Sequence, residues 1–256
     1  MKDKTLLGEI TTQIERGIAT ITFSHPAHNS LPGRLLAELK TAIETAGQND
    51  EVRVIILRSG GDRTFCAGAS FDELMAIQDE TTGKTFFLGF ANVINAIRKC
   101  PKFVLGRVQG KAIGGGVGLA SATDYCVATK FAAVKLSELA IGIGPFVVGP
   151  AVARKVGQSA FQQLAINATA LQSAEWAREK GLYAAVFDDA AAMDEHLEEL
   201  AQKLAKSSPE AMRELKRISW EGTENWDELL DTRAAISGEL VLSDFTRNAI
   251  AAFKNK

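Results

Sequence analysis

The sequence lacks the features that mark several classes of specialised protein. Its 29 basic and 31 acidic side chains leave a net charge of −2, so there is no basic field to hold nucleic acid. The three cysteines, Cys66, Cys100 and Cys126, are widely spaced and form neither a zinc-binding pattern nor a disulfide framework. We therefore expect no metal site, no nucleic-acid partner and a reducing compartment, the cytoplasm.

Long apolar segments are also missing. The N-terminal stretch MKDKTLLGEI has no apolar core long enough for a signal peptide. The longest uncharged run, residues 139–153, is too short to cross a bilayer and contains Pro145 and Pro150. With 46% hydrophobic and 23% charged residues, the composition indicates an ordinary globular protein that does not associate with a membrane.

Three familiar sequence motifs are absent as well. The glycines between positions 114 and 118 do not match the dinucleotide fingerprint, because Leu119 and Ser121 stand where its third glycine is required. The chain contains neither a GxxxxGK[ST] phosphate loop nor a GxSxG nucleophile elbow. These absences argue against a nucleotide-binding fold and against an α/β-hydrolase.

The most informative stretch that is present is GKAIGGGVGLASATD, residues 110–124. It follows an apolar run at 103–108 that predicts a buried strand, and it leads into residues 117–122, which can begin a helix. Glycine lets a ligand approach the backbone, and the first N–H groups of a helix attract negative charge. The stretch predicts a site for an anion or an oxyanion, although such glycines also allow a helix to pack closely on a strand.

The remaining pattern predicts an α/β fold whose last third is mostly helical. Alternating residues at 10–14 and 18–23 predict a β-hairpin, and a helix from Pro32 to near Gly47 and a strand at 52–57 follow. This order indicates a sheet with parallel crossovers. We expect short strands at 124–128, 132–135 and 184–187, a loop at 137–146, and helices at 71–77, 86–97, 152–156, 159–166, 173–180, 190–206, 210–218, 226–235 and 244–254.

Two glycine-containing segments resemble parts of a known family. Phe65-Cys66-Ala67-Gly68 and Gly114-Gly115-Gly116 are similar to the two halves of the oxyanion hole of the crotonase, or enoyl-CoA hydratase/isomerase, family. The resemblance covers nearly the whole chain, from the hairpin and the His-Pro-x-x-Asn-Ser-Leu segment at 25–31 to the closing Ala-Ala-Phe-Lys-Asn-Lys. No single motif is specific, but the ordered set is.

The resemblance implies a fold, a substrate and an assembly. The fold would be an α/β, crotonase-like spiral of ββα units over residues 1–195, with a C-terminal helical region at 196–256 that forms trimers. The substrate would be an acyl-CoA thioester, and no separate cofactor is implied because CoA is part of that substrate. The assembly would be a homotrimer or a homohexamer.

The resemblance also assigns roles to residues. The backbone N–H groups of Ala67 and Gly115 would polarise the thioester carbonyl. Residues expected near the substrate or its CoA group are His28, Ser30, Gly68, Gly114, Phe253 and Lys256, of which the last two would reach the CoA of a neighbouring subunit. An ordinary surface role for His28 remains an alternative, and the match of the two tail residues is loose.

One catalytic acid of the family is missing. Hydratases of this family use two glutamates, three and twenty-three residues after the oxyanion glycine; here these positions are Gly118 and Glu138. A single carboxylate predicts a proton shuttle that converts a 3-enoyl-CoA to a 2-enoyl-CoA, and the apolar neighbours of Glu138 should raise its pKa. The dienoyl-CoA isomerase and dehalogenase branches are disfavoured because their aspartates would fall at Phe146 and Leu119.

Two other functions stay open. One is hydration of a 2-enoyl-CoA, including a branched or carboxylated one such as methylglutaconyl-CoA, in which a bound water, Asp72 or Glu73 replaces the missing acid. The other is binding of acyl-CoA without turnover. Asp124 is expected to satisfy a turn rather than to act in catalysis.

Overall fold

The computed structural model describes residues 7–254 and, for side chains, residues 7–252. The N-terminal hairpin consists of β1 (Glu9–Glu15) and β2 (Ile18–Ser24), which pair antiparallel across the turn at Arg16 and Gly17. Helix α1 (Gly33–Gln48) follows and buries its apolar face, which includes Leu35, Leu39 and Ile43. The sequence predicted these three elements correctly.

Strands alternate between two sheets in the central part of the chain. The large sheet has the order β1-β2-β3-β5-β7-β9, and the small sheet has the order β4-β6-β8; all pairings except β1 with β2 are parallel. The large sheet adds β3 (Val54–Ser59), β5 (Val104–Val108), β7 (Tyr125–Thr129) and β9 (Ala185–Phe187), whereas the small sheet consists of β4 (Thr64–Cys66), β6 (Lys111–Ile113) and β8 (Val134–Lys135).

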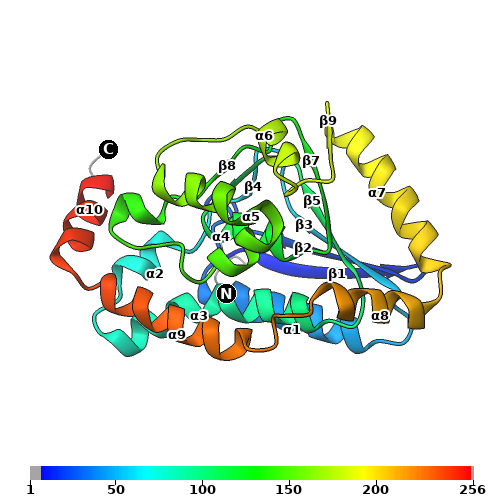
Figure 1. Cartoon of the computed structure of the whole chain (residues 1–256), viewed down its shortest axis with the longest axis horizontal. Helices are drawn as coiled ribbons and strands as arrows, with labels where there is room; N and C mark the ends of the chain where they lie inside the picture. Colours follow the sequence, from blue (N-terminus) through cyan, green and yellow to red (C-terminus); the bar gives the residue numbers. More distant parts are fainter. Residues whose placement is uncertain (1–6, 255–256) are drawn as a thin grey trace.

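From β3 to α6 the chain repeats one pattern three times: a strand of the large sheet, a strand of the small sheet and then one or more helices. The helices are α2 (Phe71–Met75) and α3 (Glu80–Lys99) after β4, α4 (Gly115–Ala122) after β6, and the 3₁₀ helix η2 (Glu138–Ile141), α5 (Gly149–Ile166) and α6 (Ala174–Glu179) after β8. The result is a succession of strand, strand and helix that repeats along the chain (Figure 1).

The large sheet is covered on both faces. In β3, Ile55 and Leu57 belong to the main core, while Val54 and Ile56 face a second cluster with Met193 of α7, as the period of two in a strand requires. Helix α7 (Ala190–Ala205) packs over that second face. The boundary expected between residues 195 and 196 lies inside this helix.

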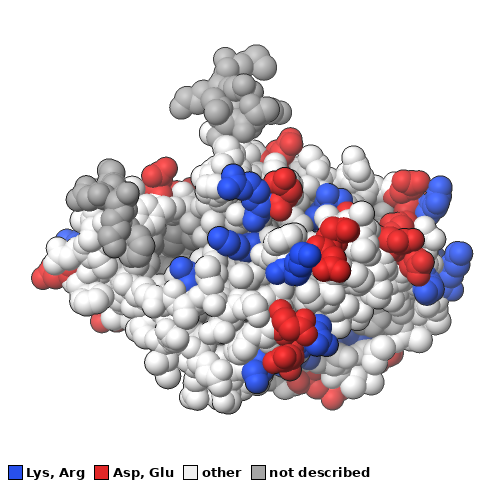
Figure 2. Space-filling model, turned by 90° about the horizontal axis from the view of Figure 1, so that it is seen from above, with Lys and Arg blue, Asp and Glu red and all other residues white. Residues whose placement is uncertain are grey.

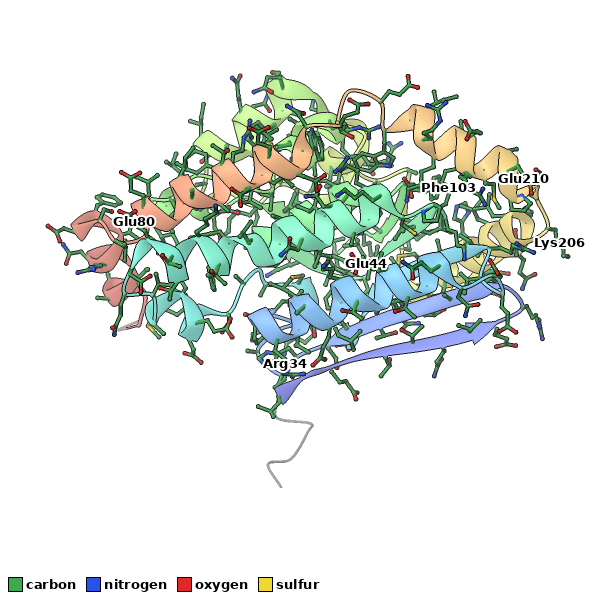
Figure 3. The ribbon with its side chains drawn as sticks, turned by 90° about the horizontal axis from the view of Figure 1, so that it is seen from below. Arg34, Glu44, Glu80, Phe103, Lys206 and Glu210 are labelled. Carbon is green, nitrogen blue, oxygen red and sulfur yellow. The ribbon has the colours of Figure 1, made fainter. Side chains whose placement is uncertain are left out.

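The last helices lie over the core. Helices α8 (Pro209–Ser219), α9 (Trp226–Leu240) and α10 (Asp244–Lys254) complete the described chain. Helices α1, α3 and α9 lie side by side (Figure 3), and Gly83 and Gly238 allow α3 and α9 to approach, because a Cβ on Gly83 would lie 2.8 Å from the Gly238 Cα. Helix α9 therefore packs closely along α3.

One face of the molecule carries mixed charge. On the face in Figure 2, basic and acidic side chains are interspersed rather than gathered by sign. None of the helices within residues 7–254 has the length and apolar character needed to cross a membrane.

Three differences from the sequence-based expectations concern element boundaries. Strands β4 and β6 were not among the expected strands, and η2 lies within the loop expected at 137–146. The helix expected at 86–97 extends to Glu80–Lys99, because Asp79 accepts a hydrogen bond from the Thr82 N–H and caps an earlier start. Helix α5 joins two expected helices across a kink at Gly157.

Candidate active site

A cavity of about 170 Å³ lies beyond the ends of the three short strands of the small sheet. Ala67 and Gly68 follow β4, Gly114 and Gly115 follow β6, and Glu138 lies shortly after β8. Parallel strands end at the same edge of a sheet, so three segments far apart in the sequence meet in one place. All five residues line the cavity.

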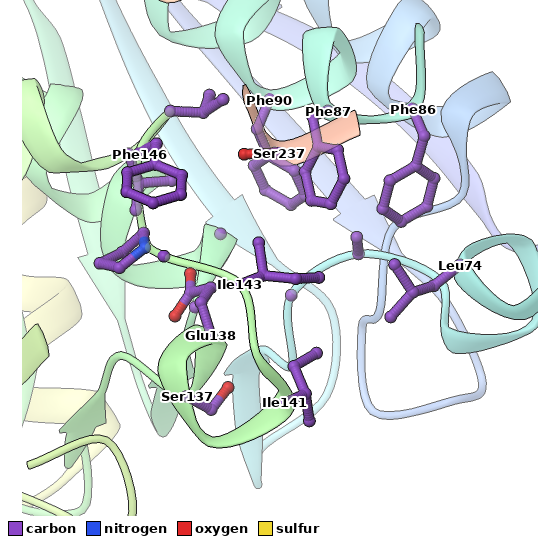
Figure 4. A pocket seen from close by; sticks show the side chains of 18 of the residues that line it. Leu74, Phe86, Phe87, Phe90, Ser137, Glu138, Ile141, Ile143, Phe146 and Ser237 are labelled. Atoms are coloured by element: carbon purple, nitrogen blue, oxygen red, sulfur yellow. The ribbon is translucent and has the colours of Figure 1, made fainter. Parts of the chain in front are cut away.

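The remaining wall of the cavity is apolar and rich in phenylalanine. It comes from α2, α3, η2 and the segment before α5, and Figure 4 displays these side chains around Glu138. The aromatic members are Phe71, Phe86, Phe87, Phe90 and Phe146. Apart from Glu138, the polar side chains in the lining are those of Ser137 and Ser237, the latter from α9.

The two predicted oxyanion loops are in contact. Gly68 has a φ of +93°, and a Cβ on it would lie 3.7 Å from the backbone nitrogen of Gly115. The Gly68 carbonyl accepts the Leu31 N–H at 2.8 Å, which holds the first loop against the chain before α1. Gly115 is the first residue of α4, so its N–H has no acceptor within the helix and lies at the positive end of the helix dipole.

Each glycine of the triplet has a separate packing reason. Gly114 adopts φ 53° and ψ −117°, and a Cβ there would lie 3.2 Å from Glu138 Oε1. A Cβ on Gly115 would enter the Phe90 ring, and one on Gly116 would lie 2.5 Å from the Cys66 carbonyl oxygen. The glycines therefore bring α4 close to β4 and leave the cavity open. The geometry is compatible both with a packing role for this stretch and with a role in binding an oxyanion.

Glu138 is the titratable group of the cavity. It begins η2, and its Oε2 is buried with no hydrogen-bond partner among the described residues. Burial raises the pKa of this carboxyl to about 7, against a weaker lowering by backbone hydrogen bonds from Glu138 itself and Ser137. Near neutral pH both protonation states are populated, which is what a group that takes up and returns a proton requires.

The position expected for the first family glutamate is closed. Gly118 is buried in α4, and a Cβ on it would lie 2.5 Å from Val148 Cγ1 and 3.6 Å from Ile94 Cδ1. Val148, which precedes α5, lines the cavity in its place. An aliphatic side chain thus stands where a second carboxylate would project in a two-glutamate site.

The structure does not bring Asp72 or Glu73 into the cavity. Asp72 is exposed, and Glu73 Oε2 accepts the Gly33 N–H at 2.8 Å at the start of α1. Asp124 also lies elsewhere, where its carboxylate accepts hydrogen bonds from the Val104 N–H, the Lys216 ammonium and the Trp220 indole. Asp124 therefore has a structural role, as expected, but its carboxylate links β5 to the end of α8 instead of satisfying a turn.

Two other predicted contact residues, His28 and Ser30, do not line the cavity. His28 is exposed, with a φ of 54°, and lines a separate hollow with the loop at 60–64. Ser30 is buried and donates its hydroxyl to the Ala69 carbonyl at 2.9 Å, so it supports the first oxyanion loop. Phe253 lies in α10, where its side chain is not described, and Lys256 falls outside the described residues. The proposed roles of these residues stay predictions.

Sequence reasoning missed several residues that shape the site. Phe86 and Phe90 are four residues apart on α3, a spacing that places both on one face of the helix. That spacing was available in the sequence, but it fits an ordinary core equally well. Val148 and Ser237 carry no local signal, because their neighbours in the cavity come from distant parts of the chain.

Comparison with known proteins agrees with the architecture. The chain is 27% identical over 252 residues to a probable enoyl-CoA hydratase of Bacillus subtilis, with 98% of this chain and 97% of that protein covered. It is 32% identical over 219 residues to the mitochondrial methylglutaconyl-CoA hydratase of Mus musculus, covering 82% and 68%. It is also 27% identical over 260 residues to a peroxisomal Delta(3,5)-Delta(2,4)-dienoyl-CoA isomerase of Arabidopsis thaliana, covering 95% and 92%.

A solved structure and a family model complete the comparison. The crystal structure of an enoyl-CoA hydratase from Bacillus halodurans superimposes with a TM-score of 0.88 at 20% identity, covering 95% of this chain and 99% of that one. The predicted crotonase-like α/β fold is therefore confirmed. The model of the enoyl-CoA hydratase/isomerase family matches residues 13–256. The chain therefore belongs to the enoyl-CoA hydratase/isomerase family.

Proposed function

We propose that this enzyme moves a double bond in an acyl-CoA thioester, from a 3-enoyl-CoA to a 2-enoyl-CoA. The observation that carries the proposal is that Glu138 is the one titratable side chain among the described residues that line the cavity. One carboxylate can take a proton from one carbon and return it to another, whereas water addition also requires a group that activates water. No separate cofactor is required, because CoA enters as part of the substrate.

The reaction would proceed in two proton transfers. The thioester oxygen would accept hydrogen bonds from the N–H groups of Ala67 and Gly115, and the Glu138 carboxylate would take a proton from C2. The C–H electrons then form the C1–C2 double bond of a dienolate, with its negative charge on the thioester oxygen. Protonated Glu138 returns the proton to C4, the double bond moves to C2–C3, and the C1 carbonyl is restored. Each oxyanion donor typically contributes about 3 kcal/mol to such a step.

The surroundings of Glu138 support both transfers. A thioester C2–H is a much weaker acid than a carboxyl group, even when the carbonyl is polarised. Because the pKa of Glu138 is raised to about 7, the pKa difference between the C2–H and this base is smaller than with an ordinary carboxyl. The free-energy cost of the first proton transfer falls accordingly. Oε2 has no hydrogen-bond partner among the described residues, so a substrate would not have to displace one. The apolar wall excludes water, which strengthens the hydrogen bonds to the oxyanion.

Hydration is the second candidate function, and the names of the Bacillus subtilis and Mus musculus relatives favour it. In this reaction Glu138 and a water bound to it would have to activate the water and also deliver the proton. Two carboxylates share these tasks in a two-glutamate site, but here Gly118 and Val148 provide no second carboxylate. Binding without turnover is the third.

A paired assay separates these functions. Purified protein is mixed with trans-3-hexenoyl-CoA or with crotonyl-CoA, and absorbance of the conjugated enoyl thioester is followed. Isomerisation raises the absorbance in the first sample, and hydration lowers it in the second. We expect the rise alone; a fall alone would contradict the proposal, and acyl-CoA binding without any change would indicate a non-catalytic protein.

Two variants tie the activity to the site. Glu138→Gln should reduce turnover by about 10²–10⁴-fold while acyl-CoA still binds. The matched control is Glu44→Gln, on the exposed face of α1 (Figure 3), where Glu44 forms a 3.6 Å surface ion pair with Lys40 that contributes little. Full activity of Glu138→Gln would contradict the assignment of this residue.

We also propose that the protein assembles as a homotrimer or homohexamer, with the chain end at Phe253 and Lys256 close to the CoA of a neighbouring subunit. Exposed apolar side chains support an assembly, since Phe131, Ile166 and Phe245 are 62%, 73% and 67% exposed. Sedimentation velocity measures the assembly directly. A monomer at micromolar concentration would contradict it.

A further inference from the structure

The charge of the cavity wall restricts the acyl group that the proposed active site can hold. Among the described residues, none of those that line the cavity is lysine, arginine or histidine. The polar side chains there are two serines and Glu138, whose ionised form is negative. Nothing in this wall can neutralise a carboxylate at the far end of an acyl chain.

Arg233 of α9 is a cation that reaches the backbone of the wall, and its side chain is not part of the lining. Its Nη1 donates to the Phe146 carbonyl at 3.3 Å, and it is not a lining residue. The lining contribution of α9 is Ser237, whose hydroxyl donates to the Arg233 carbonyl at 3.2 Å one helical turn away. The Phe146 segment therefore separates the guanidinium from the cavity.

The far side of the cavity is aromatic and aliphatic. Figure 4 places Phe86 and Leu74 on the side away from Glu138, with Phe87 between them and Phe90. Phe86 and Phe87 meet edge to face, with ring centroids 5.1 Å apart. An unpaired carboxylate placed among these groups would lose its hydration without gaining a partner, and Glu138 would add repulsion between like charges.

We propose that this site selects uncharged, hydrocarbon acyl groups and rejects acyl groups that end in a carboxylate. The inference rests on the proposed function, because it assumes that the cavity holds the acyl part of an acyl-CoA. It separates this protein from its Mus musculus relative, since methylglutaconyl-CoA, which that protein's name contains, carries such a carboxylate.

Binding of two saturated thioesters tests the selection without relying on turnover. Glutaryl-CoA ends in a carboxylate, and in 5-methylhexanoyl-CoA an isopropyl group of similar shape replaces it. By calorimetric titration of the full-length protein we expect 5-methylhexanoyl-CoA to bind at least about 100-fold more tightly, which corresponds to about 2.7 kcal/mol. Equal or tighter binding of glutaryl-CoA would overturn the inference.

A pair of variants tests the cause. Phe86→Lys places a cation on the side of the cavity away from Glu138, and Phe86→Met removes the ring without adding charge. We expect Phe86→Lys to bind glutaryl-CoA at least about tenfold more tightly than Phe86→Met does, as an opposite charge in a partly desolvated site should. No difference between the two variants would show that the charge of the wall does not set the preference.

The outcomes distinguish this inference from the proposed function. Much tighter binding of 5-methylhexanoyl-CoA than of glutaryl-CoA, without isomerisation of 3-hexenoyl-CoA, would refute the isomerase proposal and support the selection. Isomerisation together with equal binding of both saturated thioesters would do the reverse. Failure of both thioesters to bind would overturn both.

Discussion

The contact between Gly118 and Val148 allows a test in which two ordinary effects have opposite signs. Replacing a glycine inside a helix with alanine normally stabilises it by about 1 kcal/mol. Here the added Cβ would lie 2.5 Å from Val148 Cγ1 and 2.8 Å from Val148 Cβ, and overpacking of a core typically costs about 1–3 kcal/mol. The steric cost is the larger, so we expect Gly118→Ala to lower the free energy of unfolding by up to about 2 kcal/mol.

A double-mutant cycle assigns that loss to one contact. Val148→Ala would leave the atom at 2.8 Å in place, so the partner substitution has to be Val148→Gly. Alone it removes buried methyl groups and should destabilise the protein by about 2–3 kcal/mol. In the double variant the clash is gone, and we expect the two losses to fall short of additivity by at least about 1 kcal/mol.

Urea unfolding at one fixed protein concentration measures all four proteins, since association of subunits would otherwise change the apparent stability. Similar m-values across the set would show that the unfolded states are comparable. If Gly118→Ala raises the urea midpoint, helix propensity outweighs the steric cost. The close contact between Gly118 and Val148 would then be refuted. Additive losses would equally refute the assignment to Val148.

The remaining predictions concern the chemistry of the site. Ala67→Pro should reduce kcat by about 10²–10³-fold because it deletes a backbone donor to the oxyanion, whereas Ala67→Ser keeps that donor and should cost far less; equal effects would refute the donor role. Since only the carboxylate form of Glu138 accepts a proton, kcat/KM should fall about tenfold per pH unit below its pKa of about 7, and a pH-independent rate between pH 5 and 8 would contradict this. The raised pKa stabilises the folded state fully below the ordinary value of 4.5, and this contribution is lost as the pH rises through about 7; above pH 7 Glu138→Gln should therefore be more stable than the parent, by up to about 3 kcal/mol in urea unfolding. Gly118→Glu should produce hydration of crotonyl-CoA only when combined with Val148→Gly, which the absorbance assay described above would detect.

The sequence predicted most of the fold because the long elements carry local signals. The hairpin alternates apolar and polar residues, α1 repeats apolar residues on one face, and β3 is a β-branched run. Strands β4, β6 and β8 have only three, three and two residues, too few for a period to show. Sequence alone placed a strand at β8 and missed the other two, since their pairing is set by contacts between distant segments.

Only the parts of the candidate site that belong to recognisable sequence motifs were predictable. The resemblance to the crotonase family pointed to Glu138 and the two glycine loops, and the structure places them around one cavity. The reason for the glycine at 118 was not accessible, because Val148 is thirty residues away in the sequence and meets Gly118 only through the packing of α4 against α5. The cavity wall from α9 was hidden for the same reason.

The small sheet explains why the packing and chemical roles of the glycines cannot be separated. Gly116 lies so close to the Cys66 carbonyl that α4 must begin directly beside the end of β4. That contact places the Gly115 N–H next to Gly68, and the Gly114 N–H, bound to the Lys135 carbonyl at 2.8 Å, fixes the same turn to the strand that precedes Glu138. A bulkier residue at 116 would therefore separate the two oxyanion loops and shift them relative to the acid. For that reason a substitution made to test packing alone would also disturb the chemistry, whereas Gly118, one turn deeper and outside the cavity wall, can be changed and compensated without moving either donor.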